Sequence, residues 1–155
     1  MNQSNKFNQD VSHAITPYLT VKGADAAIAF YKKVFGAKEV GRITMGGMVG
    51  HAELAIGNAI LYLSEEMPAW GNKSPQTLGG SPVTIALRVN DVDATYQRAL
   101  DAGATSIEAV KDQFYGERAG GVIDPFGHRW FINTHIEDVS FVEMQRRCDA
   151  MAAAK

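Results

Sequence analysis

The sequence predicts an α+β fold in which a strand–helix–three-strand module (βαβββ) occurs twice. Two observations support this prediction. Runs of alternating apolar and polar residues, typical of strands, surround two stretches with apolar residues at helical spacing. The same order of elements restarts after residues 65–82, a Gly-, Pro- and Ser-rich segment typical of a linker. With 155 residues the chain is long enough for a single domain with a substantial core, expected over residues 13–155.

The first module is predicted within residues 14–64. Its opening strand is expected in "ITPYLTV" at 15–21, followed by a helix over 23–36 that ends at Gly36. "GGMVG" is interpreted as a hairpin turn, because it lacks the GxGxxG spacing and the following helix of a phosphate-binding loop. The remaining strands are expected at 38–45, 51–56 and 59–64.

The second module is predicted within residues 83–136. Its helix, over 90–104, has Asn90 or Asp91 available as a cap and Gly103 as its end. Strands are expected at 83–89, 105–110, 117–124 and 128–135.

A further helix is predicted at the C-terminus, over residues 140–153. Ser140 precedes Glu143 by three residues, which is the spacing of a capping box. Apolar residues then recur at helical spacing, so the helix is expected to pack on its own sheets or on a second subunit.

A tight turn is predicted before the last strand, in "DPFGHRW". Asp124, Pro125 and Gly127 occupy positions i, i+1 and i+3 of a type I turn. Strand alternation then places Trp130 and Phe131 on opposite faces.

Composition narrows the classes of partner and location. The net charge is −2 and no basic run occurs, so nucleic acid is not expected as a partner. No apolar run reaches the length of a membrane span, and the polar residues 1–12, expected to be a disordered lead, lack the apolar core of a secretion signal. The single cysteine, Cys148, cannot form an intramolecular disulfide. These features predict a cytoplasmic protein.

Four motifs resemble those of a known superfamily: "HAEL" at 51–54, "YGER" at 115–118, "DPFGHRW" at 124–130 and "THIEDVS" at 134–140. Together with the two modules, they resemble the vicinal oxygen chelate proteins, which include glyoxalase I, extradiol dioxygenases and the bleomycin and fosfomycin resistance proteins. The likeness is greatest to the PhnB-like branch. It implies a curved, eight-stranded, barrel-like arrangement around a cavity, commonly completed in a homodimer.

The resemblance also implies where a metal would bind. In metal-dependent members, four positions supply His, Gln or Glu ligands, and here these positions hold Thr16, Leu61 or Tyr62, Thr84 and Phe131. Threonine and apolar or aromatic side chains do not replace carboxylate and imidazole ligands. We therefore expect no metal cofactor at the usual site.

His51 and Glu53 are two residues apart on one predicted strand and therefore share a face. They are interpreted either as a polar pair in the cavity or as an edge pair at the surface. A displaced metal site there would instead support a glyoxalase-like lyase or isomerase. His13, His128 and His135 carry no catalytic prediction: His128 is expected to bond nearby backbone, and His135 to anchor the exit from the last strand.

Aromatic residues from several strands and loops predict an apolar pocket for a small hydrophobic or aromatic ligand. Phe131 is placed inside it, because it shares parity with the family's last metal ligand. Alternatively, these rings simply fill the barrel, and the chain acts as a scaffold. The candidate ligand-binding residues are Thr16, Tyr18, His51, Glu53, Tyr62, Thr84, Phe114, Tyr115 and Phe131.

Overall fold

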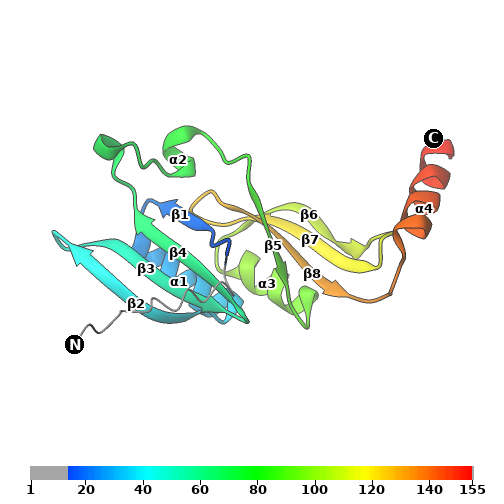
Figure 1. Cartoon of the computed structure of the whole chain (residues 1–155), viewed down its shortest axis with the longest axis horizontal. Helices are drawn as coiled ribbons and strands as arrows, with labels where there is room; N and C mark the ends of the chain where they lie inside the picture. The colour runs from blue at the N-terminus through cyan, green and yellow to red at the C-terminus, as the bar shows by residue number, and fades with distance from the viewer. Residues whose placement is uncertain (1–13, 155) are drawn as a thin grey trace, which may run out of the picture.

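A computed structural model describes residues 14–154 and contains the two predicted modules in order (Figure 1). The predicted lead at residues 1–12 and His13 lie outside the described residues. The first module consists of β1 (Tyr18–Val21), α1 (Ala24–Phe35), β2 (Lys38–Met45), β3 (Met48–Ile56) and β4 (Ala59–Glu65). The second consists of β5 (Thr84–Arg88), α3 (Val92–Asp101), β6 (Thr105–Asp112), β7 (Glu117–Ile123) and β8 (Arg129–His135).

Each module forms its own four-stranded mixed sheet with the same topology. The strand orders are β1-β4-β3-β2 and β5-β8-β7-β6. In both sheets the first strand runs parallel to the last, and the other neighbours are antiparallel. The predicted α+β class and the repeated βαβββ order are confirmed. The two sheets do not join into a closed barrel (Figure 1).

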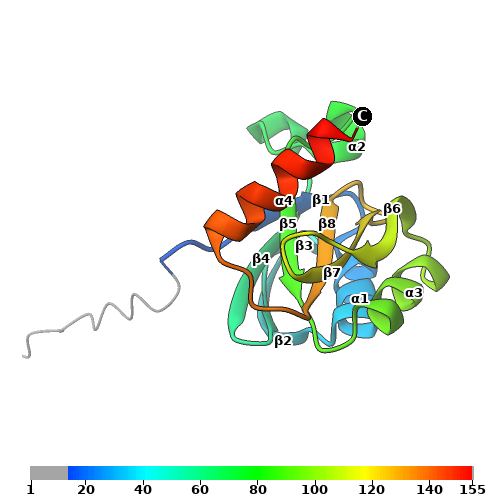
Figure 2. The same cartoon turned by 90° about the vertical axis from the view of Figure 1, so that its right-hand side faces the viewer.

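The two helices cover one face of the sheets and join the two modules. α1 contacts the strands of the first sheet, α3 contacts those of the second, and the helices also contact each other (Figure 2). Arg98 of α3 donates to the Val34 carbonyl at the end of α1. Buried apolar residues from both modules form one continuous cluster, in which Trp130 and Tyr31 are the largest fully buried side chains. A single core therefore serves the whole duplicated unit.

The helices begin and end close to where the sequence predicts. Gly36, at φ 68°, ends α1 in the left-handed conformation that favours glycine. Asp91, and not Asn90, caps α3 by accepting a hydrogen bond from the Ala94 amide. Gly103 follows the end of α3 with φ 99°.

The connection at residues 66–83 contains two short helical turns that the linker prediction did not include. These are η2 (Pro68–Trp70) and α2 (Pro75–Leu78). The Glu66 carboxylate accepts hydrogen bonds from the Ser74 amide and the Thr77 hydroxyl, and these bonds lower the pKa of Glu66 to about 2. A local carboxylate thus gives this Gly- and Pro-rich stretch a defined path.

The C-terminal helix α4 (Phe141–Ala153) extends at one end of the molecule (Figure 1). Ser140 caps it, as predicted, by accepting a hydrogen bond from the Glu143 amide. The other half of the predicted capping box does not form; the Glu143 carboxylate instead accepts from Arg146 and Arg147. None of the residues of α4 is buried. No helix among the described residues is long and apolar enough to cross a membrane.

Candidate functional site

Four of the predicted site residues meet on the face of the first sheet that α1 does not cover. We call Tyr18, His51, Glu53 and Tyr62 the Tyr18 cluster. Strand pairing places Tyr18 opposite Tyr62, and Tyr62 opposite Glu53. Because side chains alternate along a strand, His51 shares the face of Glu53, and Leu61 and Leu63 point into the core. The predicted His51–Glu53 pair is therefore joined by two tyrosines from neighbouring strands.

Hydrogen bonds and ring contacts connect the members of the Tyr18 cluster. The Tyr18 hydroxyl lies 2.9 Å from His51 Nδ1, and His51 Nε2 lies 3.4 Å from Glu53 Oε1. A neutral imidazole satisfies both contacts when Nδ1 accepts from Tyr18 and Nε2 donates toward Glu53. The rings of Tyr18, His51 and Tyr62 contact one another edge to face, with centroids 5.0–5.7 Å apart. The cluster offers aromatic surface beside a carboxylate.

The uncovered face of the second sheet carries Phe131 and Thr84. Phe131 lies between Ala86 of β5 and Gly121 of β7 and is half-buried. Its neighbour Trp130 points the other way and is 1% exposed in the core, as strand alternation predicts. The two cross-strand neighbours of Phe131 are small, and the Ile107 side chain lies over Gly121.

Phe114 and Tyr115 lie elsewhere, at the turn between β6 and β7. They line a pocket of about 310 Å³ with Phe141, Met144 and Cys148 of α4. This pocket lies beside α4, at the end of the molecule away from the first sheet (Figure 1). Burial raises the pKa of the Tyr115 phenol, and the Glu108 charge raises it further. The structure therefore does not bring these two residues to the Tyr18 cluster within one chain.

A second pocket near α4 is lined by charged groups that the sequence analysis did not bring together. It has a volume of about 640 Å³ and includes Arg88, Glu117, His135 and Asp138 in its wall. Glu117 Oε1 accepts from Arg88 at 2.7 Å and faces His135 Nδ1 at 3.2 Å, and its Oε2 is buried without a hydrogen-bond partner. His135 Nε2 lies 2.8 Å from Asp138. Hydrogen bonding to Asp138, and secondarily to Glu117, raises the pKa of His135.

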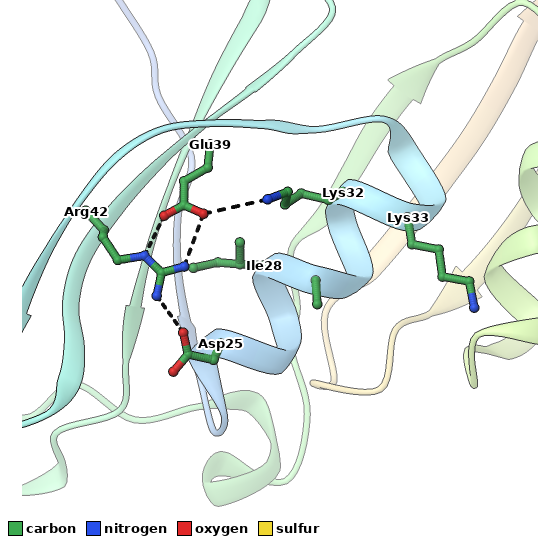
Figure 3. Close-up of a pocket in the computed structure, with 7 residues that line it drawn as sticks. Asp25, Ile28, Lys32, Lys33, Glu39 and Arg42 are labelled. Carbon is green, nitrogen blue, oxygen red and sulfur yellow. Dashed lines mark hydrogen bonds and ion pairs between the residues drawn. The ribbon is translucent and has the colours of Figure 1, made fainter.

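A third pocket lies on the other side of the first sheet, between α1 and β2, and has a volume of about 480 Å³ (Figure 3). Arg42 donates to both Asp25 and Glu39, and Lys32 lies 4.0 Å from Glu39 (Figure 3). Bonding to Arg42 is the main cause that lowers the pKa of Glu39. Asp25, Glu39, Lys32 and Arg42 thus form a surface ion-pair network, and Lys33 also lines the hollow.

His128 and His135, the described histidines outside the Tyr18 cluster, have structural partners. His128 Nε2 lies 3.0 Å from the Thr20 carbonyl of β1, so it contacts distant backbone and not the nearby backbone that we predicted. His135 anchors the exit from β8, as predicted, through Glu117 and Asp138. The residue missed by sequence reasoning is Asp124, whose buried carboxylate accepts four hydrogen bonds. Its place at the start of "DPFG" indicated a turn, but not that its carboxylate would accept hydrogen bonds from Tyr31 and Trp130 in the core.

The positions at which the resemblance implies metal ligands hold side chains unsuited to that role. Thr84 is exposed and accepts from Arg129, and Phe131 and Tyr62 present rings. Thr16 lies just before β1. Across residues 14–154, no three His, Cys, Asp or Glu side chains converge as a metal site would require. A displaced metal at His51 and Glu53 would therefore have two protein ligands among the described residues.

Comparisons with known proteins agree on one family. Residues 11–132 match the model of the glyoxalase/bleomycin resistance protein/dioxygenase superfamily. An uncharacterized protein of Mycobacterium bovis is 46% identical over 140 residues, covering 88% of this chain and 92% of its own. The X-ray structure of a gene product from Arabidopsis thaliana is 30% identical, with a TM-score of 0.63, and covers 76% of this chain and 95% of its own. The bleomycin resistance determinant of transposon Tn5 is 21% identical, with a TM-score of 0.57, covers 78% and 96%, and shares the fold.

Proposed function

Because the chain belongs to the glyoxalase/bleomycin resistance protein/dioxygenase superfamily, we propose that it binds a small aromatic molecule against its uncovered sheet faces without a metal. The observation that carries this proposal is the Tyr18 cluster. Three rings from three strands stand in contact on a face that no helix covers. Aromatic side chains with a few polar groups are the usual lining of small-molecule sites.

The second part of the site is Phe131, at a position where metal-dependent relatives are expected to carry a ligand. A phenyl ring there supplies stacking surface in place of coordination. Thr16 and Thr84 are the polar residues proposed to orient the bound molecule. A cytoplasmic, PhnB-like binding protein that sequesters its ligand is the reading that these features support best.

A homodimer is part of the proposal. The uncovered face of the first sheet exposes large apolar side chains, with Ile43 66% and Tyr18 54% exposed. Exposed apolar side chains grouped on one face are typical of interaction surfaces. Pairing of two copies through these faces would enclose the Tyr18 cluster in a cavity. Sedimentation equilibrium tests this step, and a monomer at micromolar concentration would contradict it.

Ligand binding is tested by a thermal-shift screen with flat aromatic compounds. A ligand that binds the native state raises the melting temperature by mass action. We expect hits with the wild-type protein and loss of the shift in Tyr62→Leu. Phe114→Leu is the matched control, because it removes a half-buried ring beside α4 and leaves the Tyr18 cluster intact. Loss of the shift in Phe114→Leu alone would move the site to α4 and contradict the proposal.

The alternative is a glyoxalase-like lyase or isomerase that uses a displaced metal at His51 and Glu53. Their contact is the observation that favours this alternative. Elemental analysis of protein purified without chelator would then give about one metal per chain, and the hemithioacetal of methylglyoxal and glutathione would be converted. On the proposed function, neither result is expected.

A further inference from the structure

Glu53 differs from the other carboxylates in its bonding. Each of the other carboxylates that the structure describes accepts a hydrogen bond from a side chain or a backbone amide at 3.0 Å or less, as Glu117 does from Arg88 and Glu65 from the Ala24 amide. Glu53 has one contact, to His51 Nε2 at 3.4 Å. Its side chain is 39% exposed. Its negative charge is therefore left without a close partner among residues 14–154.

The immediate neighbours of Glu53 on its face carry no positive side chain. Across the strands it lies between Gly41 and Tyr62, and along β3 it lies between His51 and Ala55. Both contacts of His51 can be made by a neutral ring, when the Tyr18 hydroxyl donates to Nδ1 and Nε2 donates toward Glu53. The Glu53 carboxylate therefore lies beside the rings of His51 and Tyr62, and its immediate neighbours carry no positive side chain.

Aromatic rings and a carboxylate both attract cations. The face of an aromatic ring carries negative electrostatic potential, and rings grouped around a binding site are known to hold quaternary ammonium groups. In the Tyr18 cluster, the rings of Tyr18, Tyr62 and His51 stand at 68–80° to one another, so their faces point in different directions. Glu53 adds a full negative charge beside them.

We propose that the ligand of the Tyr18 cluster is an organic cation, with an ammonium group against Glu53 and an aromatic part against Tyr62. This inference rests on the proposed function, because it assigns a charge to the ligand of the same site. It predicts that the protein binds a cation more tightly than a neutral molecule of the same shape. A neutral molecule of the same outline gains the apolar contacts but leaves Glu53 without a counter-charge.

Phenyltrimethylammonium and tert-butylbenzene test the proposal, because they share a shape and differ in charge. Both are titrated into the full-length protein by ligand-observed NMR. We expect the wild type to prefer the cation by about tenfold, which corresponds to about 1.4 kcal/mol and lies within the range of cation–π contacts. Glu53→Gln should weaken binding of phenyltrimethylammonium by about tenfold and so remove that preference.

Glu108→Gln is the matched control. Its side chain is 42% exposed, close to the 39% of Glu53, but it lies on β6 of the second sheet beside Lys111. This variant should retain the preference for the cation. Equal binding of the two compounds by the wild type would overturn the cation assignment and leave the aromatic binding site standing. If neither compound binds and the flat aromatic screen also fails, the proposed function fails with it.

Discussion

The Tyr31 hydroxyl donates a hydrogen bond of 2.6 Å to the Asp124 carboxylate, 93 residues further along the chain. Trp130 Nε1 donates to the same oxygen at 2.8 Å, and the other oxygen accepts from the amides of Phe126 and His128. Burial raises the pKa of the Tyr31 phenol well above its usual value, and the Asp124 charge adds to the rise. This bond joins the helix of the first module to the turn of the second.

Removing one side of this bond should destabilise the whole domain. Tyr31→Phe leaves a charged, buried acceptor with one donor fewer, and hydrogen bonds to charged groups contribute about 1.5–3 kcal/mol. Asp124→Asn should cost more, because an amide cannot accept all four bonds. Urea denaturation followed by Trp fluorescence measures both. Tyr96→Phe is the control, since its hydroxyl bonds Ser106 near the surface, and it should cost about 1 kcal/mol or less.

The fold was predictable because the information is local. Helical spacing, strand alternation and the turn at Asp124–Gly127 can each be recognised from a few consecutive residues. The hydrogen bond from the Gly127 amide to the Asp124 carbonyl confirms the turn. The site was only partly predictable. His51 and Glu53 are neighbours on one strand, but the contact of Tyr18 with His51 depends on how three strands are ordered. The position of Phe114 and Tyr115 beside α4, away from the Tyr18 cluster, likewise follows from tertiary packing.

Gly116 cannot carry a side chain. It has φ 89°, and a Cβ atom would overlap the carbonyl of Glu137, which passes directly over it. The Ile136 and Glu137 amides both donate to the Gly116 carbonyl. Gly116→Ala should therefore destabilise by about 1–2 kcal/mol from the left-handed backbone and by roughly another 1–3 kcal/mol from overpacking.

Gly57→Ala separates these two contributions, because Gly57 has φ 58° and open space where its Cβ would be. Gly57→Ala should lower the free energy of unfolding only by the contribution of the left-handed backbone, about 1–2 kcal/mol. Chemical denaturation of both variants provides the comparison. Equal costs at the two sites would mean that the chain after β8 does not hold its place over Gly116.

His135 predicts a pH dependence of stability. Its folded-state pKa is raised, so its contribution to stability is fully present below the unfolded-state pKa, at about 6.5. The contribution is lost as the pH rises through the folded-state pKa. Both ring nitrogens face carboxylate oxygens, which only accept, so both bonds need the protonated ring.

Unfolding free energies of wild type and His135→Gln, measured between about pH 5 and pH 9, test this sign. The difference between the two proteins should favour the wild type at low pH and shrink toward high pH. In the Asp138→Asn variant, the pH range over which His135 stabilises the fold should be narrower, since Asp138 is the main cause of the raised pKa of His135. If the stability advantage of the wild type over His135→Gln grew with pH, the stabilising role of protonated His135 would be contradicted.

Arg147 fastens α4 to the β6–β7 turn and to the segment after β8 through polar bonds. It donates to the Phe114 carbonyl at 3.0 Å and to the Glu137 carboxylate at 2.7 and 2.9 Å. Arg147→Met should therefore speed hydrogen exchange in α4 and leave exchange in β7 unchanged. Arg146→Met is the matched control, because within residues 14–154 Arg146 bonds Glu143 of its own helix alone. Equal effects of the two variants would show that helix propensity, and not anchoring, governs α4.

The bond between Tyr31 and Asp124 also has a consequence for synthesis on the ribosome. β1 pairs with β4, so the first sheet can close once residues 18–65 have emerged, with Tyr18 opposite Tyr62. At that moment the partner of the Tyr31 hydroxyl has not yet been translated. The nascent first half therefore carries a polar group in its future core that stays hydrated until the second half arrives. Because of this delay, we expect the two halves to complete their packing together and not in succession.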